Sequence, residues 1–166
     1  MYTLLSEMMN EKMNPQNKPY VLIEGFADAI SKESYPHDSS IIYAGNLGED
    51  NGIMTLIEAF KKSKLHEKCN LVIFGDGNGE KKIISIASKD KHIQFMGVKP
   101  NREVLQRLYR AKLLVNPRPT HEEFVLYSFP SKTIEYLGTG TPFASTKLPS
   151  IPDEYFTYID SLHEGK

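Results

Sequence analysis

The pattern that decides the fold begins in residues 41–62, which read IIYAGNLGEDNGIMTLIEAFKK. An apolar run at residues 41–44 ends at Gly45, and an amphipathic stretch at residues 53–62 follows it. The run is continuous rather than alternating, which is typical of a strand covered on both faces. In the following stretch, apolar residues recur at spacings of three and four, which indicates a helix. Together they predict one strand-to-helix unit.

The same unit repeats along the chain. Further strands are predicted at residues 71–74, 93–96, 113–115 and 142–145, and further helices at residues 80–88, 102–110 and 129–137. Strands that alternate with helices of about ten residues indicate parallel strands joined by right-handed crossovers. The sequence therefore predicts the α/β class, with a three-layer Rossmann-like parallel sheet and helices on both faces.

The two ends of the chain depart from this pattern. Residues 1–13 are expected to form a helix, and residues 20–23 are expected to form a strand. After Pro152 no further strand or helix is expected. We therefore expect residues 1–19 to be a linker helix or the remnant of a preceding domain. Residues 20–160 are expected to form one domain that is incomplete at its C-terminus.

Composition limits the class of protein. The chain has 166 residues, a net charge of -1 and 40% hydrophobic residues, which is typical of a globular domain. Its lysines and arginines do not form the basic tail that nucleic-acid binding favours. No apolar run approaches the roughly 18–20 residues that span a bilayer. The single cysteine, Cys69, cannot form an intramolecular disulfide and fits a reducing compartment. A cytoplasmic location is therefore expected.

Metal and nucleotide motifs are mostly lacking. The five histidines show no ligand spacing, no Asp-x-Asp pair occurs, and there is no phosphate-binding loop ending in Gly-Lys-Ser/Thr. The glycine-rich segment at residues 75–79 has Glu80 where a dinucleotide fingerprint needs its third glycine. The preferred interpretation of this segment is a tight turn that uses glycines for positive φ. It can still border a ligand cleft, because ligands bind at the carboxyl ends of parallel strands.

The start of the helix at residues 129–137 is a candidate anion site. Its first-turn N–H groups lack helical partners, the helix dipole favours negative charge there, and Lys132 adds a full positive charge. The alternative is an ordinary surface ion pair between Lys132 and Glu135, which are three residues apart on one helix face. Spacing alone leaves both interpretations open. Glu122 and Glu123, in the preceding loop, are either functional or simply solvated acids.

Several segments in this order resemble one family. They are YAGNL at residues 43–47, LVIFGDG at 71–77, NP at 116–117 and SFPSKTIEYLGTGTP at 128–142. They resemble the C-terminal, donor-binding domain of the retaining GT-B glycosyltransferases of family four, the group 1 type. Those enzymes build capsule, lipopolysaccharide and other surface glycans from nucleotide sugars. The resemblance covers about residues 20–155 and implies that this chain is one half of a two-domain GT-B architecture.

The resemblance implies roles for individual residues. The diphosphate would lie on the start of the helix at residues 129–137, the ribose on Glu135, and the base on the backbone near Val98 and Lys99. Glu122 and Glu123 would meet the hydroxyls of the transferred sugar, and with Lys132 they are the expected catalytic residues. The expected donor-binding residues are Gly45, Asn46, Gly75, Val98, Lys99, Ser128, Phe129, Pro130, Ser131, Thr133 and Glu135. The implied chemistry needs no metal and no cofactor beyond the nucleotide sugar.

The sequence departs from the family pattern at several positions. Tyr127 stands where the first glutamate of the paired-glutamate motif would fall, eight residues before Glu135. Asn46 and Asn51 stand where the family commonly has basic residues after the first strand. The family's enzymes are also roughly twice as long as this chain. An N-terminal acceptor domain or a separate partner chain would therefore have to complete the enzyme.

The resemblance implies transfer from a UDP- or GDP-linked hexose to a growing cell-surface glycan or lipid-linked acceptor. This chain would supply the donor-binding half. The acceptor domain could associate peripherally with the inner face of the membrane. The alternatives are a non-catalytic nucleotide-sugar-binding subunit, an inactive fragment, and an epimerase or phosphorylase with the same two-domain architecture.

Overall fold

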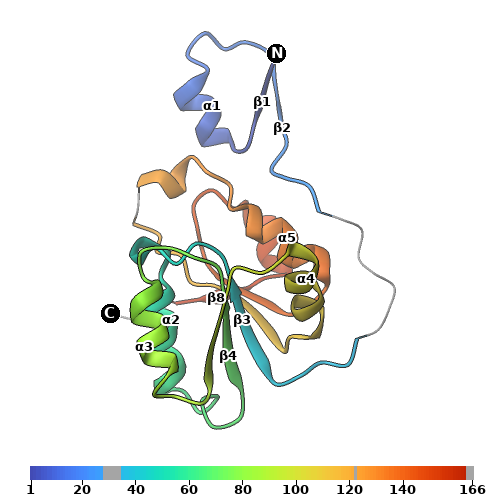
Figure 1. Ribbon diagram of the computed structural model, residues 1–166. Helices are drawn as coiled ribbons and strands as arrows, with labels where there is room; N and C mark the ends of the chain where they lie inside the picture. Colours follow the sequence, from blue (N-terminus) through green and yellow to red (C-terminus); the bar gives the residue numbers. More distant parts are fainter. Residues whose placement is uncertain (28–34, 122, 164–166) are drawn as a thin grey trace.

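The computed structural model of the chain describes residues 1–27, 35–121 and 123–163 (Figure 1). Its main part is a six-stranded, entirely parallel sheet in the order β5-β4-β3-β6-β7-β8. The strands are β3 (Ser40–Ala44), β4 (Asn70–Phe74), β5 (Ile93–Gly97), β6 (Leu113–Asn116), β7 (Phe143–Thr146) and β8 (Asp160–Leu162). The helices around it are α2 (Ile53–Lys62), α3 (Glu80–Ala87), α4 (Asn101–Arg110) and α5 (Ser131–Thr139).

Helices cover both faces of the sheet, because successive side chains of a strand point to opposite faces. On one face, Ile41 and Tyr43 of β3 pack in a core with α2 and α3. On the other face, Ile42 and Ala44 pack in a second core with α4 and α5. Figure 1 shows α2 and α3 on one side of the sheet and α4 and α5 on the other. The predicted three-layer Rossmann-like architecture is therefore confirmed.

The strand order reverses between β3 and β6. From β3 the chain moves outward through β4 to β5, then returns to β6 on the other side of β3 and continues to β7 and β8. The two series of crossovers leave β3 and β6 in opposite directions. A crevice therefore opens outside the carboxyl ends of these two strands, which is where open α/β sheets bind ligands.

A buried tyrosine joins α5 to the end of β3. The Tyr136 hydroxyl accepts from the Ala44 N–H at 2.8 Å and donates to the Ala44 carbonyl at 3.2 Å. The pairing of β3 with β6 covers Ile41 and Ile42, so Tyr136 provides partners for Ala44 beyond the end of that ladder. The Tyr136 ring also makes an edge contact with Phe143 of β7. Burial raises the pKa of Tyr136, so the hydroxyl stays neutral.

Glycine is required where the loops after β3 and β4 touch. Gly75 has a φ of +125°, and a Cβ there would lie 1.8 Å from the carbonyl oxygen of Gly45. The Gly45 N–H in turn donates to the Phe74 carbonyl at 3.1 Å. The predicted tight turn with glycines at positive φ is confirmed. Its contact with Gly45 fixes the backbone where β3 ends.

The N-terminal segment forms a separate β-α-β unit of β1 (Tyr2–Leu4), α1 (Glu7–Met13) and β2 (Tyr20–Leu22), with β1 and β2 parallel. The predicted helix over residues 1–13 is therefore wrong for Tyr2–Leu4 and confirmed for Glu7–Met13. The apolar residues of this segment are compatible with a helix or a strand. Pairing with β2 makes Tyr2–Leu4 a strand. Ser6 then starts the helix, because its side chain accepts the Met9 N–H.

The strand predicted at residues 20–23 is confirmed as β2. The expected domain boundary after residue 19 falls between β1 and β2, which pair with each other. The unit also contacts the loop before α5, because the Lys12 ammonium lies 3.9 Å from the centre of the Tyr127 ring. Tyr127, where the family motif would have a glutamate, thus faces a lysine of this unit.

The C-terminal segment continues the sheet, contrary to expectation. After Pro152 the chain forms a short 3-10 helix, η3 (Asp153–Thr157), and then β8, which pairs in parallel with β7. The expectation of no further strand after Pro152 is therefore wrong. Only three residues form β8, and two of them are exposed, so no apolar run marks it. Pairing with β7 decides its conformation.

Helix α5 begins two residues later than predicted. Pro130 is its N-cap, with an extended backbone, and its carbonyl accepts the Thr133 N–H at 2.8 Å. Phe129 is buried with Val125 and Leu148 in a third apolar cluster. The helix ends at Thr139, with Gly140 in the left-handed conformation, rather than at residue 137. The start of α5 is thus held by packing of Phe129.

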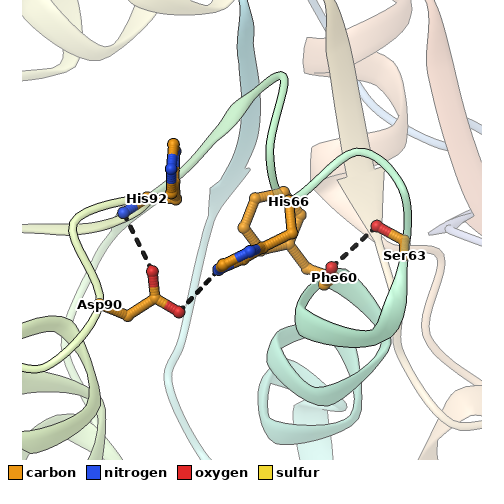
Figure 2. A network of polar contacts seen from close by, with 5 residues as sticks. All are labelled: Phe60, Ser63, His66, Asp90 and His92. Carbon is orange, nitrogen blue, oxygen red and sulfur yellow. Dashed lines mark hydrogen bonds and ion pairs between the residues drawn. The ribbon is translucent and has the colours of Figure 1, made fainter.

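A polar network at the amino ends of the strands joins the loops before β4 and β5 (Figure 2). The His66 Nε2–H donates to Asp90 at 2.8 Å, and the other Asp90 oxygen accepts the His92 N–H at 3.1 Å. Burial alone would raise the pKa of Asp90, but the hydrogen bonds from His66 and His92 together hold it below its usual value. The carboxylate therefore stabilises the folded chain.

Replacement of Tyr136 by Phe is expected to lower the free energy of unfolding. The substitution leaves the Ala44 N–H and carbonyl without their partner, which costs about 1–3 kcal/mol. Urea denaturation at pH 7 measures the difference. Tyr158→Phe, at an exposed tyrosine, is the matched control and is expected to change stability by less than about 0.5 kcal/mol. Equal stability of Tyr136→Phe and the wild type would contradict this role.

Replacement of Asp90 by Asn is expected to destabilise the chain in a pH-dependent way. The folded pKa of Asp90 lies below its unfolded value, so its stabilisation is present above about pH 4 and is lost as the pH falls through the folded pKa. We expect a cost of about 1 kcal/mol at pH 7. Urea titrations at several pH values measure it, with the exposed Asp160→Asn as control. A cost independent of pH would exclude the charge as its origin.

Candidate functional site

A cavity of about 360 Å³ lies at the crevice between the carboxyl ends of β3 and β6 and the start of α5. Its walls come from three segments that are distant in the sequence. They are Tyr43, Ala44, Gly45, Asn46 and Asn51 from the β3 side, Val115, Asn116 and Arg118 from the β6 side, and Ser128, Phe129, Pro130, Ser131, Lys132 and Tyr136 from α5 and the segment before it. The cavity occupies the switch point of the sheet, where ligand binding is expected.

The wall after β3 is a loop held by its own hydrogen bonds. The Tyr43 hydroxyl donates to the Asn46 carbonyl at 2.6 Å. The Asn46 side-chain oxygen accepts the Gly48 N–H at 2.7 Å and the Asn51 amide at 3.2 Å. The two asparagines that stand in place of the family's basic residues are thus bonded to each other and supply no charge. Burial raises the pKa of Tyr43 to about 12, so its hydroxyl is neutral near pH 7.

The wall after β6 is fixed on both sides of Arg118. A Cβ at Gly52, whose φ is +74°, would lie 2.0 Å from the carbonyl oxygen of Pro117, so only glycine permits this contact. The Arg118 carbonyl accepts the hydroxyl of Thr146, at the end of β7. Burial lowers the pKa of Arg118, and the neighbouring Tyr43 opposes this shift. Arg118 as a residue is half-buried in the cavity wall.

The third wall is the first turn of α5. Its N-cap is Pro130, and no side chain caps the helix. The first-turn N–H groups and the dipole of α5 therefore favour an anion at this end. The Lys132 ammonium lies 2.6 Å from a Glu135 oxygen, with the two side chains 36% and 22% exposed. The ion pair that was one of two alternatives is thus present, and Lys132 still lines the cavity.

The structure brings together seven of the expected site residues from two segments. These are Gly45, Asn46, Ser128, Phe129, Pro130, Ser131 and Lys132. Gly75 lies directly behind them through its contact with Gly45. Glu135 borders a second, smaller hollow of about 240 Å³ between α4 and α5, and Ser131 lines both hollows.

Other expected residues lie elsewhere. Val98 is 68% exposed in the loop after β5, and Lys99 borders a different hollow beside α4. Thr133 is fully buried, and its hydroxyl has no hydrogen-bond partner among the described residues. Glu122 lies outside the described residues, and Glu123 is described only as the first residue of the 3-10 helix η2 (Glu123–Leu126).

The expected site residues did not include Asn116 and Arg118, which line the β6 side of the cavity. Asn116 is the last residue of β6, and Arg118 lies in the loop after it, at the carboxyl ends of the strands where parallel sheets bind ligands. The Asn116 amide donates to the Ser145 hydroxyl at 3.3 Å, across to β7. Arg118 is the first basic residue after β6, and its position beside β3 depends on the strand order. A search of that loop for cations would have found it.

The charged side chains in the described lining of the cavity are both cations. Among the described residues, its lining contains Arg118 and Lys132 and no carboxylate. A concave site with this charge attracts anions. In the described part of the chain, no three His, Cys, Asp or Glu side chains are grouped so that they could hold a metal ion. No described helix is long and apolar enough to cross a membrane.

Comparison with solved structures supports the same fold. The chain resembles the pneumococcal O-GlcNAc transferase GtfA, solved with UDP and GlcNAc, with a TM-score of 0.68 and 20% identity over 89% of this chain and 30% of that one. It also resembles AviGT4, a glycosyltransferase of avilamycin A biosynthesis, with a TM-score of 0.72 and 12% identity over 98% and 49% of the two chains. At these identities the likeness shows the fold alone.

A third similar structure matches this chain over about three quarters of the length of each protein. It is the catalytic domain of the cholesterol-α-glucosyltransferase from Helicobacter pylori, with a TM-score of 0.56 and 22% identity over 76% of this chain and 77% of that one. The chain spans about a third to a half of the length of GtfA and AviGT4. No curated protein matches the chain.

A family model matches residues 27–158, which is most of the chain and includes all three walls of the cavity. The model is that of the glycosyl transferases group 1. The sequence resemblance, the Rossmann-like sheet and the structural neighbours agree with it. The chain therefore belongs to the group 1 family of glycosyl transferases.

Proposed function

We propose that the cavity binds the diphosphate of a nucleoside-diphosphate sugar and that this chain supplies the donor-binding half of a retaining glycosyltransferase. One observation carries the proposal. Two cations and the uncapped start of α5 line one cavity at the switch point of the sheet, and its lining has no described carboxylate. A diphosphate suits this arrangement, because helix N-termini and basic side chains bind phosphate oxygens.

In the proposed reaction, the bond between the sugar C1 and the phosphate oxygen breaks and leaves its electron pair on the diphosphate. The acceptor hydroxyl bonds to C1, and its proton passes to the departing phosphate oxygen. The N–H groups of Ser131 and Lys132 and the cationic side chains stabilise the charge that develops on the leaving group. This stabilisation requires no metal. Glu122 and Glu123 remain the proposed contacts of the transferred sugar.

The nucleoside is proposed to occupy the hollow between α4 and α5. Glu135 lines this hollow with Asn101 and Tyr109, and Ser131 connects it to the diphosphate cavity. The Glu135 carboxylate can accept hydrogen bonds from the ribose hydroxyls. UDP is present in the structure of pneumococcal GtfA, which favours a uridine donor over guanosine for the first test. The backbone near Val98 and Lys99 is the proposed contact of the base.

The acceptor is proposed to bind to a part outside this chain, either a preceding domain or a partner protein. The chain spans less than half of the length of several similar structures, and one of these is the complex of GtfA with GtfB. Transfer to a surface glycan or lipid-linked acceptor, in the cytoplasm at the inner face of the membrane, is the proposed setting. Water exclusion and placement of the acceptor require both halves of the cleft.

A second candidate is a non-catalytic subunit that binds the nucleotide sugar for another chain. The N-terminal β-α-β unit favours it, because the apolar side chains of Tyr2, Leu5, Met13 and Val21 are exposed there. A two-stranded parallel sheet is also too small to be stable alone. Both functions use the same donor site.

Thermal unfolding with UDP, GDP and ADP, each with and without magnesium, tests the proposal. A ligand at 100 times its dissociation constant adds about 2.7 kcal/mol, or roughly 5–10 °C for a domain of this size. We expect one nucleoside diphosphate to raise the Tm equally with and without magnesium. We expect Lys132→Gln to reduce the shift, because it removes one of the two cations.

Lys112→Gln is the matched control, because Lys112 is exposed at the amino end of β6, away from the cavity. It is expected to retain the full shift. A chain that melts cooperatively but gains no stability from any of the nucleotides would contradict the proposed donor site. A shift that requires magnesium would contradict the metal-independent part.

A further inference from the structure

A group of lysines lies at the amino ends of β4 and β5, where the sequence reads KKSKLHEK at residues 61–68 and KDKH at residues 89–92. These two segments contain six lysines and two carboxylates. The six lysines are all exposed, and we call them the basic face: Lys61, Lys62, Lys64, Lys68, Lys89 and Lys91. The whole chain has a net charge of -1, so this positive charge is a local feature.

The polar network of Figure 2 holds the two segments together. The His66 Nε2–H donates to Asp90 at 2.8 Å, and Asp90 also accepts the His92 N–H at 3.1 Å. The rings of His66 and His92 make an edge contact, with their centroids 5.1 Å apart. One lysine stands on each side of Asp90 in the sequence, so these bonds bring both lysines close to residues 61–68. The basic face is therefore one surface.

The nearby carboxylates leave most of this positive charge unbalanced. Asp90 is bonded to His66 and to the His92 N–H, and its side chain is only 11% exposed. Glu58 and Glu67 are exposed, but in the part of the chain that the structure describes neither forms an ion pair with a lysine. Four lysines of the basic face line a hollow of about 540 Å³. This hollow presents positive charge to an approaching anion.

An exposed apolar side chain lies within the basic face. Leu65 is 40% exposed, in the turn between α2 and β4. A leucine among lysines fits a lipid surface, because the leucine can enter the headgroup region while the ammonium groups reach lipid phosphates. An acidic protein would also attract the lysines, but a strongly acidic surface offers little apolar area for the leucine. The combination therefore favours a membrane.

The basic face and the donor cavity lie at opposite ends of the strands. The lysines precede β4 and β5, whereas the cavity lies at the carboxyl ends of β3 and β6. The N-terminal unit also contacts the carboxyl side, through Lys12 and Tyr127. A membrane at the basic face would therefore leave both the cavity and the N-terminal unit accessible.

We propose that the basic face binds the surface of an anionic lipid bilayer, so that the donor-binding chain itself attaches peripherally to the membrane. The sequence led us to expect such a contact only through the acceptor domain. This attachment goes beyond the proposed function and uses none of the residues of the donor site. Each lysine that reaches an anionic membrane strengthens binding about fivefold, and Leu65 adds the burial of apolar area.

Sedimentation of the full 166-residue chain with lipid vesicles tests the proposal. The vesicles contain phosphatidylcholine alone or with about one third phosphatidylserine. At pH 7 and low salt, we expect binding only to the vesicles that contain phosphatidylserine. The net charge of -1 does not favour these vesicles, so binding requires a local positive surface. Salt at about 0.5 M is expected to release the chain, because it screens the lysines.

Paired substitutions locate the contact. The double variant Lys62→Gln and Lys64→Gln is expected to weaken binding roughly 25-fold, from about fivefold for each lysine. Leu65→Gln is expected to weaken it by about threefold or more. The matched control is Lys81→Gln with Lys82→Gln, since both lysines are exposed at the start of α3, at the other end of the sheet. The control changes the net charge equally and is expected to bind as the wild type does.

A second pair, Lys89→Gln with Lys91→Gln, is expected to weaken binding as much as the first, because both segments form one surface. It also provides the test if the first pair does not fold, which thermal melts of each variant will show. Titration with UDP measures the donor site separately, and all these variants are expected to match the wild type in it. Loss of vesicle binding with unchanged UDP binding therefore supports the proposal.

Four results would overturn the proposal. The first is no binding to vesicles with phosphatidylserine, and the second is equal binding to both kinds of vesicle. The third is equal weakening by the control pair, which would indicate a response to net charge alone. The fourth is binding to soluble polyglutamate without binding to vesicles, which would assign the basic face to an acidic protein. A wild type that binds vesicles but no nucleotide would contradict the donor site and support the basic face.

Discussion

The pair of hydrogen bonds between Tyr136 and Ala44 is the interaction on which the site depends. It fixes the middle of α5 to the last residue of β3, so the start of the helix stays at the crevice between β3 and β6. Both partners are buried, and the backbone groups of Ala44 would be unsatisfied without the tyrosine. The cavity is therefore a consequence of how this helix is attached to the sheet.

Close backbone contacts complete the same arrangement. Gly75 permits the loop after β4 to touch Gly45, and Gly52 permits the loop after β6 to touch the start of α2. The Gly75 contact supports the wall after β3 from behind, and the Gly52 contact joins the β3 side to the wall after β6. No side chain larger than hydrogen fits at either glycine. Rigid loops on a parallel sheet can hold an anion without rearrangement, which reduces the entropic cost of binding.

Most of the fold could be predicted from the sequence, because its strands are continuous apolar runs and its helices have clear apolar faces. The predictions fail where the local apolar pattern is weak and pairing with a neighbouring strand determines the conformation. Tyr2–Leu4 becomes a strand only because β2 lies beside it, and β8 forms on β7 with two of its three residues exposed. In the site, Ser131 and Lys132 follow from the local rules of a helix start. Arg118 does not, because its place in the cavity depends on the strand order.

The central claim is that a nucleoside diphosphate binds at the crevice between β3, β6 and α5. Amide ¹⁵N–¹H spectra of the labelled chain during titration with UDP and GDP test it most directly. The account predicts that the largest changes fall on the amides of Gly45, Asn46, Arg118, Ser131 and Lys132. Changes concentrated at His66 and His92, at the amino ends of the strands, would contradict it. The absence of any change in a folded chain would also contradict it.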